Sequence, residues 1–197
     1  MPSELEVREE LRRWIAGQGN GGVQIVDEFW VPSTNERADL AAIGGTLDGF
    51  EIKTAQDTLK RLPRQSEGYA RLFDHCTAVV AERHLSGALE TLPAWWGVVL
   101  IETVDGNPAL CPVREAGPNP LIDGETLVRL LWKKEARDAL GEIGVDVEEG
   151  ASRCMLWERL VEAVSLTRLA ELVRHALLGR DPSSARIPTR RFSSASL

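Results

Sequence analysis

Three charged residues on two neighbouring predicted strands could carry out hydrolytic chemistry. Asp39 lies in the first strand and Glu51 in the second, with Gly45 between the two strands. If the chain turns at Gly45, the numbers of directly opposed residues sum to 90, which places Asp39 opposite Glu51. Lys53 follows Glu51 by two residues, so a strand places both side chains on one face of the sheet. The pattern therefore predicts two carboxylates and one ammonium group at a single site.

Such a site favours a divalent cation. Opposed carboxylates, with Cβ atoms about 4.5–5.5 Å apart, repel each other, and a cation between them relieves the repulsion. Hard oxygen ligands are those that Mg²⁺ prefers, and a neighbouring lysine can orient or help deprotonate a bound water. One alternative remains at this stage, because Asp48-Gly49 is itself a hairpin signal and a turn there would not pair Asp39 with Glu51. Another is an ordinary hairpin with surface charges.

The elements around these residues predict a mixed α/β core. A capping-box pattern at Ser3 and Glu6 begins a helix over 3–16, and Pro63 is expected to kink or divide a later helix. Apolar spacing predicts, in order, a helix at 3–16, strands at 23–31, 39–43 and 47 to 53 or 54, a helix at 58–73, a strand at 78–81, a helix at 85–92 and a strand at 96–102.

The order of these elements and residues resembles the PD-(D/E)XK nuclease superfamily. Asp39 is followed by Glu51-Ile52-Lys53 on the next strand, and Gln65-Ser-Glu-Gly-Tyr69 matches the Gln-x-x-x-Tyr element of the RecB-like branch. The Arg-Ala-Asp, Glu-Ile-Lys and Arg-Leu-Pro-Arg-Gln segments resemble a group of small uncharacterised bacterial proteins in that superfamily more closely still. Arg-Ala stands where the superfamily's name has Pro before the aspartate. The resemblance covers roughly residues 1–102 and implies a restriction-endonuclease-like core.

The resemblance also implies roles for the site residues. Asp39, Glu51 and the Ile52 carbonyl would bind Mg²⁺ or Mn²⁺ as cofactor. Lys53 would activate water or stabilise the charge of the transition state, and Gln65 would orient groups at the site.

Three further assignments follow from the same resemblance. Tyr69 would lie nearby, either in packing or as a DNA contact. The superfamily often adds an acidic residue from the first helix or a nearby strand. Glu10 and Glu28 are both candidates here, and Glu28 is preferred as a metal ligand because it lies beside the predicted sheet.

A basic cluster accompanies the helix that carries Gln65. Phosphate contact is a natural use of such a cluster, since arginine forks match phosphate oxygens. The alternative is a solvated helix face with ion pairs to Asp57, Glu67 and Asp74. The cluster consists of Lys60, Arg61, Arg64 and Arg71, of which Lys60, Arg61 and Arg64 are expected to contact DNA.

The second half of the chain changes character. We expect the core to span 1–104, a linker or loop 105–125, a small all-helical region 126–179 with helices at 127–140, 155–164 and 166–178, and a Ser- and Arg-rich flexible tail 180–197. Residues 130–160 resemble the helix, turn and helix of SAP-like DNA-binding modules, with Leu156-Trp-Glu-Arg-Leu160 in the second helix. DNA binding, a helical cap on the core, and a surface for a recruiting protein or a homodimer stay open.

Charge and composition narrow the functional classes. The 197 residues hold 23 Lys and Arg against 30 Asp and Glu, a formal net charge of −7, which argues against a protein that coats nucleic acid with its whole surface. An acidic N-terminus without a long apolar stretch argues against secretion or a membrane, so we expect a cytoplasmic location. Taken with these residues, the resemblance to PD-(D/E)XK nucleases implies a Mg²⁺- or Mn²⁺-dependent deoxyribonuclease of bacterial or phage DNA repair, processing or defence, and the choice of DNA over RNA follows from the resemblance alone. The alternative is a catalytically silent nucleic-acid or protein-binding module on the same fold.

Overall fold

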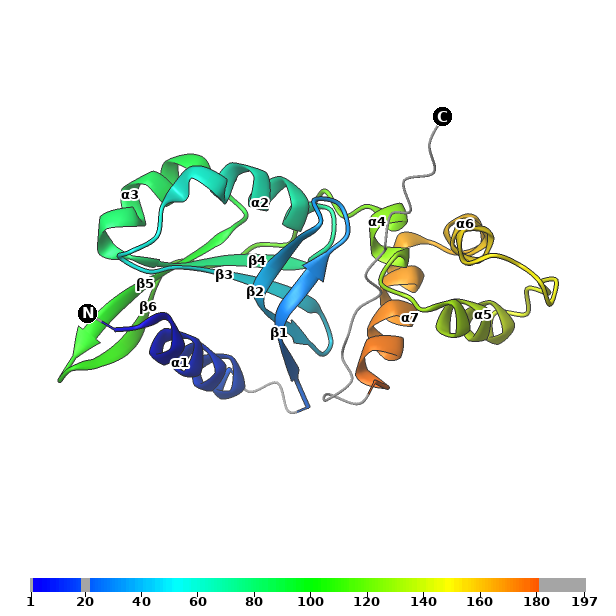
Figure 1. Ribbon diagram of the computed structural model, residues 1–197, viewed down its shortest axis with the longest axis horizontal. Coiled ribbons are helices and arrows are strands. Elements are labelled where there is room, and N and C mark those ends of the chain that lie inside the picture. The colour runs from blue at the N-terminus through cyan, green and yellow to red at the C-terminus, as the bar shows by residue number, and fades with distance from the viewer. Residues whose placement is uncertain (1, 19–21, 181–197) are drawn as a thin grey trace, which may run out of the picture.

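One mixed six-stranded sheet organises the residues up to Arg114 (Figure 1). The computed structural model describes residues 2–18 and 22–180. The strands lie side by side in sequence order, antiparallel except that β3, β4 and β5 run parallel. They are β1 (Gln24–Val31), β2 (Glu36–Ile43), β3 (Leu47–Lys53), β4 (His75–Ala81), β5 (Gly97–Val104) and β6 (Asn107–Arg114).

Helices cover both faces of this sheet (Figure 1). Helix α1 (Glu4–Gly17) starts with the predicted capping box of Ser3 and Glu6, and its apolar residues pack on one face against Leu40, Phe50 and Ile52. The opposite face carries the short 3₁₀ helix η1 (Leu59–Arg61), α2 (Leu62–Ala70) and α3 (Glu82–Thr91). Pro63 stands in the first turn of α2, where no intrahelical N–H is needed, so it divides the predicted helix as expected.

The β2–β3 hairpin has the predicted register. The pairs run from Ile43 opposite Leu47 to Leu40 opposite Phe50, so the numbers of each pair sum to 90 and the turn centres on Gly45. The alternative turn at Asp48-Gly49 is wrong, because both residues lie within β3 and pair with Ala42 and Ala41 of β2. Asp39 and Glu51 therefore occupy the next opposed positions along this hairpin.

The expected linker at 105–125 is wrong for residues 107–114, which form the edge strand β6. Asp105 and Gly106 both adopt positive φ, 51° and 82°, as the tight turn between β5 and β6 requires. Pro108 and Pro112 are tolerated because an edge strand leaves one side without ladder partners. The Asp-Gly pair was the readable signal for this hairpin, and the prolines obscured it.

The all-helical region begins slightly before its predicted start, and its first predicted helix is two helices. The backbone N–H of Trp132 donates to Glu135 Oε2 at 2.7 Å, which starts a new helix where continuous periodicity had been expected. The helices are α4 (Gly124–Val128), α5 (Lys133–Glu142), α6 (Arg153–Ala163) and α7 (Leu166–Leu178).

These helices share a hydrophobic core with the sheet. Leu127, Leu172 and Val173 belong to the same buried cluster as Phe29 and Phe73. The Arg174 guanidinium on α7 lies 3.3 Å from the carboxylate of Asp74, which precedes β4. Of the expected flexible tail, residues 181–197 lie outside the described part of the chain. No helix among the described residues is long and apolar enough to cross a membrane.

Candidate active site

A charged pocket of about 360 Å³ lies where β2, β3 and α2 meet. Most of the residues that the sequence had suggested for catalysis or metal binding line it. From β2, β3 and α2 come Asp39, Glu51, Ile52, Lys53 and Gln65, joined by Glu28 and Arg61; Glu4, Asn35, Glu36, Arg37 and Asp57 complete the wall. Side chains separated by up to 61 positions in sequence thus converge on one cavity.

The Glu51 carboxylate is the centre of a buried hydrogen-bond network. Its Oε1 accepts from Lys53 Nζ and from Gln65 Nε2, each at 2.5 Å. Its Oε2 accepts from the Tyr69 hydroxyl at 2.5 Å. Because Glu51 and Lys53 are only 2% and 3% exposed, each charge is compensated by the other rather than by water. This network fixes the Glu51 carboxylate at one position facing the pocket.

Asp39 sits in a less compensated environment. Its Oδ2 accepts a hydrogen bond from the backbone N–H of Ile52 at 2.6 Å, which ties the side chain across the hairpin. Burial, and then the negative charge of Glu51, raise the pKa of Asp39 to about 7, against the opposing effects of the Ile52 N–H, Lys53 and Arg8. A carboxyl group in this situation holds its charge only with additional positive charge nearby.

Arg8 of α1 supplies part of that charge, and sequence reasoning missed it. Its Nη1 donates to the backbone oxygen of Asp39 at 2.8 Å, and its Nη2 lies 3.2 Å from Glu28 and 2.7 Å from Glu4. The helical spacing of Glu4 and Arg8, off the apolar face formed by Val7 and Leu11, was the available signal. The spacing could not show which strand the side of the helix that carries Glu4 and Arg8 approaches.

The structure brings Glu28 to the pocket and leaves Glu10 away from it. Glu28 falls between the pairs Asp27–Leu40 and Phe29–Ala38, so it stands beside Asp39 in the β1–β2 register. Its φ of 49° is unusual for a non-glycine residue within a strand and marks a local irregularity at the site. Glu10 instead pairs with Arg13 at 2.7 Å.

Two residues of the Gln-x-x-x-Tyr element take different roles. Gln65 is 3% exposed, and its Oε1 has no hydrogen-bond partner within residues 2–18 and 22–180 although its Nε2 donates to Glu51. Such an unpaired buried acceptor beside a cavity is suited to a water or a substrate group. Tyr69 is completely buried and stacks on Trp96 at 5.6 Å between ring centroids. Of the two roles expected for Tyr69, packing agrees with this burial and a direct contact with DNA does not, because the side chain has no exposed surface.

The basic cluster borders the pocket on one side. Arg61 lines it, whereas Lys60 and Arg71 are exposed without lining it. Arg64 turns toward the β1–β2 loop, donating to the backbone oxygen of Thr34 at 3.1 Å and lying 3.5 Å from Glu36. Among the ion pairs formed by residues 2–18 and 22–180, none joins this cluster to Asp57, Glu67 or Asp74.

The donor atoms at the pocket fit a partly hydrated magnesium ion. Asp39 and Glu51 offer carboxylate oxygens, and Ile52, which also lines the pocket, offers a backbone carbonyl. Mg²⁺ is commonly held by one or two carboxylates while it keeps several waters. In the described part of the chain, no three His, Cys, Asp or Glu side chains come together as a ready ligand set. Asp39, Glu51 and the Ile52 carbonyl would be the protein's ligands in such a site, and Glu28, expected as a further ligand, lines the same pocket.

The fold and the pocket define a mixed α/β protein with an acid–lysine site on a central sheet. The chain belongs to the family described as Bacteriophage P4 protein cII, whose family model matches residues 4–192. Protein cII of Enterobacteria phage P4 is 28% identical over 178 residues, which cover 90% of this chain and 67% of that protein. No solved structure matches. The residues matched by the family model include both the sheet and the C-terminal helices.

Proposed function

We propose that this protein is a metal-dependent nuclease that hydrolyses DNA phosphodiester bonds. The observation that carries the proposal is the convergence of Asp39, Glu51 and Lys53 on one pocket, with Glu51 held by a network of three donors. Two acids and an ammonium group beside an unpaired amide oxygen form a set suited to phosphoryl chemistry. Mg²⁺ or Mn²⁺ held by Asp39, Glu51 and the Ile52 carbonyl would supply a water of lowered pKa and positive charge against the phosphate.

Each residue of this chain has a separate task in the proposed reaction. Lys53, fixed by Glu51, places positive charge where the phosphate oxygens gain negative charge. Gln65 presents its free Oε1 to the attacking water and thereby orients it. Arg61, on the pocket wall, is positioned to bind a phosphate of the DNA strand.

The arrangement of elements supports the resemblance to PD-(D/E)XK nucleases. A helix, three antiparallel strands, a helix and a parallel strand follow one another, and the Gln65 and Tyr69 side chains of α2 both reach Glu51. Placement in the RecB-like branch and a DNA rather than an RNA substrate follow from this resemblance. DNA repair, processing or defence in a bacterial or phage setting, in the cytoplasm, remains the proposed context.

A cleavage assay tests the proposal. Purified protein is incubated with supercoiled, linear and single-stranded DNA in Mg²⁺, Mn²⁺ or EDTA. We expect metal-dependent cleavage that falls by at least about 100-fold in Asp39→Asn and Lys53→Met. Lys134→Ala, which removes an exposed lysine paired with Asp138, is the control and should cleave like the wild type. Circular dichroism establishes that each variant is folded.

A second candidate function is a catalytically silent binding module, and the position of Arg8 beside the acids of the pocket favours it. Arg8 lies 3.6 Å from the Asp39 carboxylate and 3.2 Å from that of Glu28, so its single positive charge partly compensates these acids without a cation. Calorimetric titration with Mg²⁺ and Mn²⁺ separates the two functions. A heat of metal binding that the wild type shows and Asp39→Asn lacks supports the nuclease. If the wild type neither binds the metal nor cleaves DNA, the binding module is the better assignment.

A further inference from the structure

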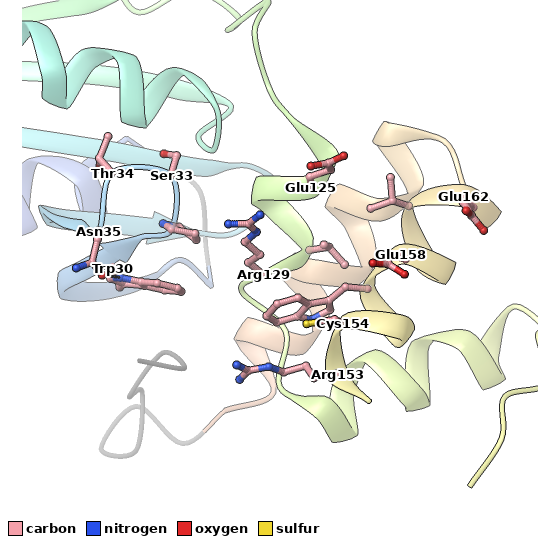
Figure 2. A pocket seen from close by; sticks show the side chains of 14 residues that line it. Trp30, Ser33, Thr34, Asn35, Glu125, Arg129, Arg153, Cys154, Glu158 and Glu162 are labelled. Atoms are coloured by element: carbon pink, nitrogen blue, oxygen red, sulfur yellow. Dashed lines mark hydrogen bonds between the residues drawn. The ribbon is translucent and has the colours of Figure 1, made fainter. Parts of the chain in front are cut away.

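A second cleft, of about 580 Å³, opens between the β1–β2 loop and helices α4 and α6 (Figure 2). Its volume falls in the range of about 300–1,000 Å³ that is typical of ligand sites. Asn35 lines this cleft and also lines the charged pocket, so the two cavities adjoin at the β1–β2 loop. A strand bound at the charged pocket would reach this cleft within a short distance.

Two tryptophans with fixed ring orientations line the cleft. The Trp30 indole N–H donates to Asn35 Oδ1 at 3.0 Å, and the Trp157 indole N–H donates to the Leu131 backbone oxygen at 3.2 Å. Both residues are partly exposed and also pack against the core, and the guanidinium of Arg153 lies 4.7 Å from the centroid of the Trp157 ring. Partly exposed, oriented indoles with an arginine against one of them are the features on which unpaired bases stack.

The charges around the cleft favour a base over a bare phosphate chain. Figure 2 shows the Arg129 side chain reaching from the end of α4 toward the loop that carries Ser33 and Thr34. Among the described residues, neither Arg129 nor Arg153 is paired with a carboxylate, so both are free to meet a flanking phosphate. The cleft also holds three glutamates that repel phosphate and accept hydrogen bonds from the amino groups of bases, namely Glu125, Glu158 and Glu162.

We infer that this cleft binds an unpaired nucleobase of the DNA strand whose phosphate occupies the charged pocket. The inference rests on the proposed function, and it makes single-stranded DNA, or a single-stranded end or flap, the preferred substrate. It also gives the helical region a role in binding DNA, through Arg129, Arg153 and Trp157 rather than through a separate module.

The test measures binding without cleavage. Fluorescence anisotropy in EDTA gives the Kd for a labelled single strand of about 12 nucleotides, for the same strand with abasic sites throughout, and for the matching duplex. We expect the wild type to bind the normal strand at least about tenfold more tightly than the abasic strand. Trp157→Leu should abolish this difference, and Trp30→Leu should reduce it.

The matched control is Trp132→Leu. Trp132 is a partly exposed tryptophan outside the cleft, and the Arg180 guanidinium lies 5.8 Å from the centroid of its ring. This variant should bind all three probes like the wild type. Arg129→Gln is a second variant that leaves the packing intact, since Arg129 is exposed, and it should lower the salt dependence of binding by about one released ion.

The outcomes separate this inference from the proposed function. Equal affinity of the wild type for normal and abasic strands, or of Trp157→Leu and wild type for the normal strand, overturns the cleft even if the protein cleaves DNA. Absence of single-strand binding also overturns it. Base-dependent binding without any metal-dependent cleavage would support the inference that the cleft binds a nucleobase and would overturn the proposal that the protein is a nuclease.

Discussion

Arg8 lies against Asp39 on both its backbone and its carboxylate. Nη1 donates to the Asp39 backbone oxygen at 2.8 Å, and Nη2 lies 3.6 Å from Asp39 Oδ1. The Arg8 side chain is 14% exposed, and it also contacts Glu4 and Glu28. Helix α1 therefore contributes a positive charge to the same group of acids that would hold a cation.

The first prediction concerns this arginine. Arg8→Gln should destabilise the metal-free protein by about 1–3 kcal/mol, because partly buried acids lose their counter-charge. Mg²⁺ should then raise the melting temperature of the variant more than that of the wild type, since the cation replaces the lost charge. Thermal unfolding with and without Mg²⁺ measures both effects.

Arg13→Gln is the control for this experiment, because Arg13 is on the same helix, is 70% exposed and pairs with Glu10. An exposed ion pair contributes little to stability. Equal melting temperatures of the two variants would show that Arg8 does not stabilise the acid group.

The second prediction concerns pH. The pKa of Asp39 in the folded protein, about 7, lies above its ordinary value of 3.8, so the folded state binds more protons than the unfolded state between these values. The stabilising effect of the Asp39 proton is fully present below pH 3.8 and is lost as the pH rises to about 7. The metal-free wild type should therefore lose on the order of 2–4 kcal/mol of stability over this range relative to Asp39→Asn. Urea unfolding at several pH values measures the difference, and parallel curves for the two proteins would refute it.

The third prediction uses the single tyrosine of the chain. Burial, and then the charge of Glu51, raise the pKa of Tyr69 well above its ordinary value of 10.0. Absorbance at the tyrosinate band should therefore show no ionisation of the folded protein until alkali unfolds it, whereas the protein in urea should titrate near the ordinary value. Tyr69→Phe should lose about 1–3 kcal/mol, because Glu51 Oε2 loses its donor while the ring packing stays. Ionisation of Tyr69 near pH 10 in the folded state would contradict its burial against Glu51.

The predictable part of the site is its local part. Strand alternation places Glu51 and Lys53 on one face, and one turn at Gly45 places Asp39 opposite Glu51. Sequence positions alone are therefore enough to predict this arrangement. Arg8 and Tyr69 reach the site from helices, and their contacts depend on how those helices pack on the sheet. Sequence periodicity gives the buried face of a helix but not the strand that it meets.

The same reasoning applies to the fold. Helix α1, the β2–β3 hairpin and the division of a helix at Pro63 were predicted, because capping, turn and proline signals act within a few residues. The edge strand β6 was not predicted, and the packing of the C-terminal helices on the sheet was only one of the alternatives that the sequence left open. The core joins residues as far apart in sequence as Phe73 and Val173, which belong to one buried cluster, so no local pattern reports it.

The last prediction tests the hairpin that positions Asp39 and Glu51. A Cβ at Gly49 would lie 2.5 Å from the Phe73 ring, which is completely buried, so Gly49→Ala should cost about 1–3 kcal/mol. Gly45→Ala is the matched control in the same hairpin, where a Cβ meets nothing within 4 Å, and its stability should stay within about 0.5 kcal/mol of the wild type. The Phe73 and Tyr69 ring centroids are 5.1 Å apart, so a displaced Phe73 also pushes on the residue that donates to Glu51. Gly49→Ala should therefore lower both the melting temperature and any metal-dependent cleavage rate, whereas equal stability of the two alanine variants would show that β3 does not pack on Phe73 as described.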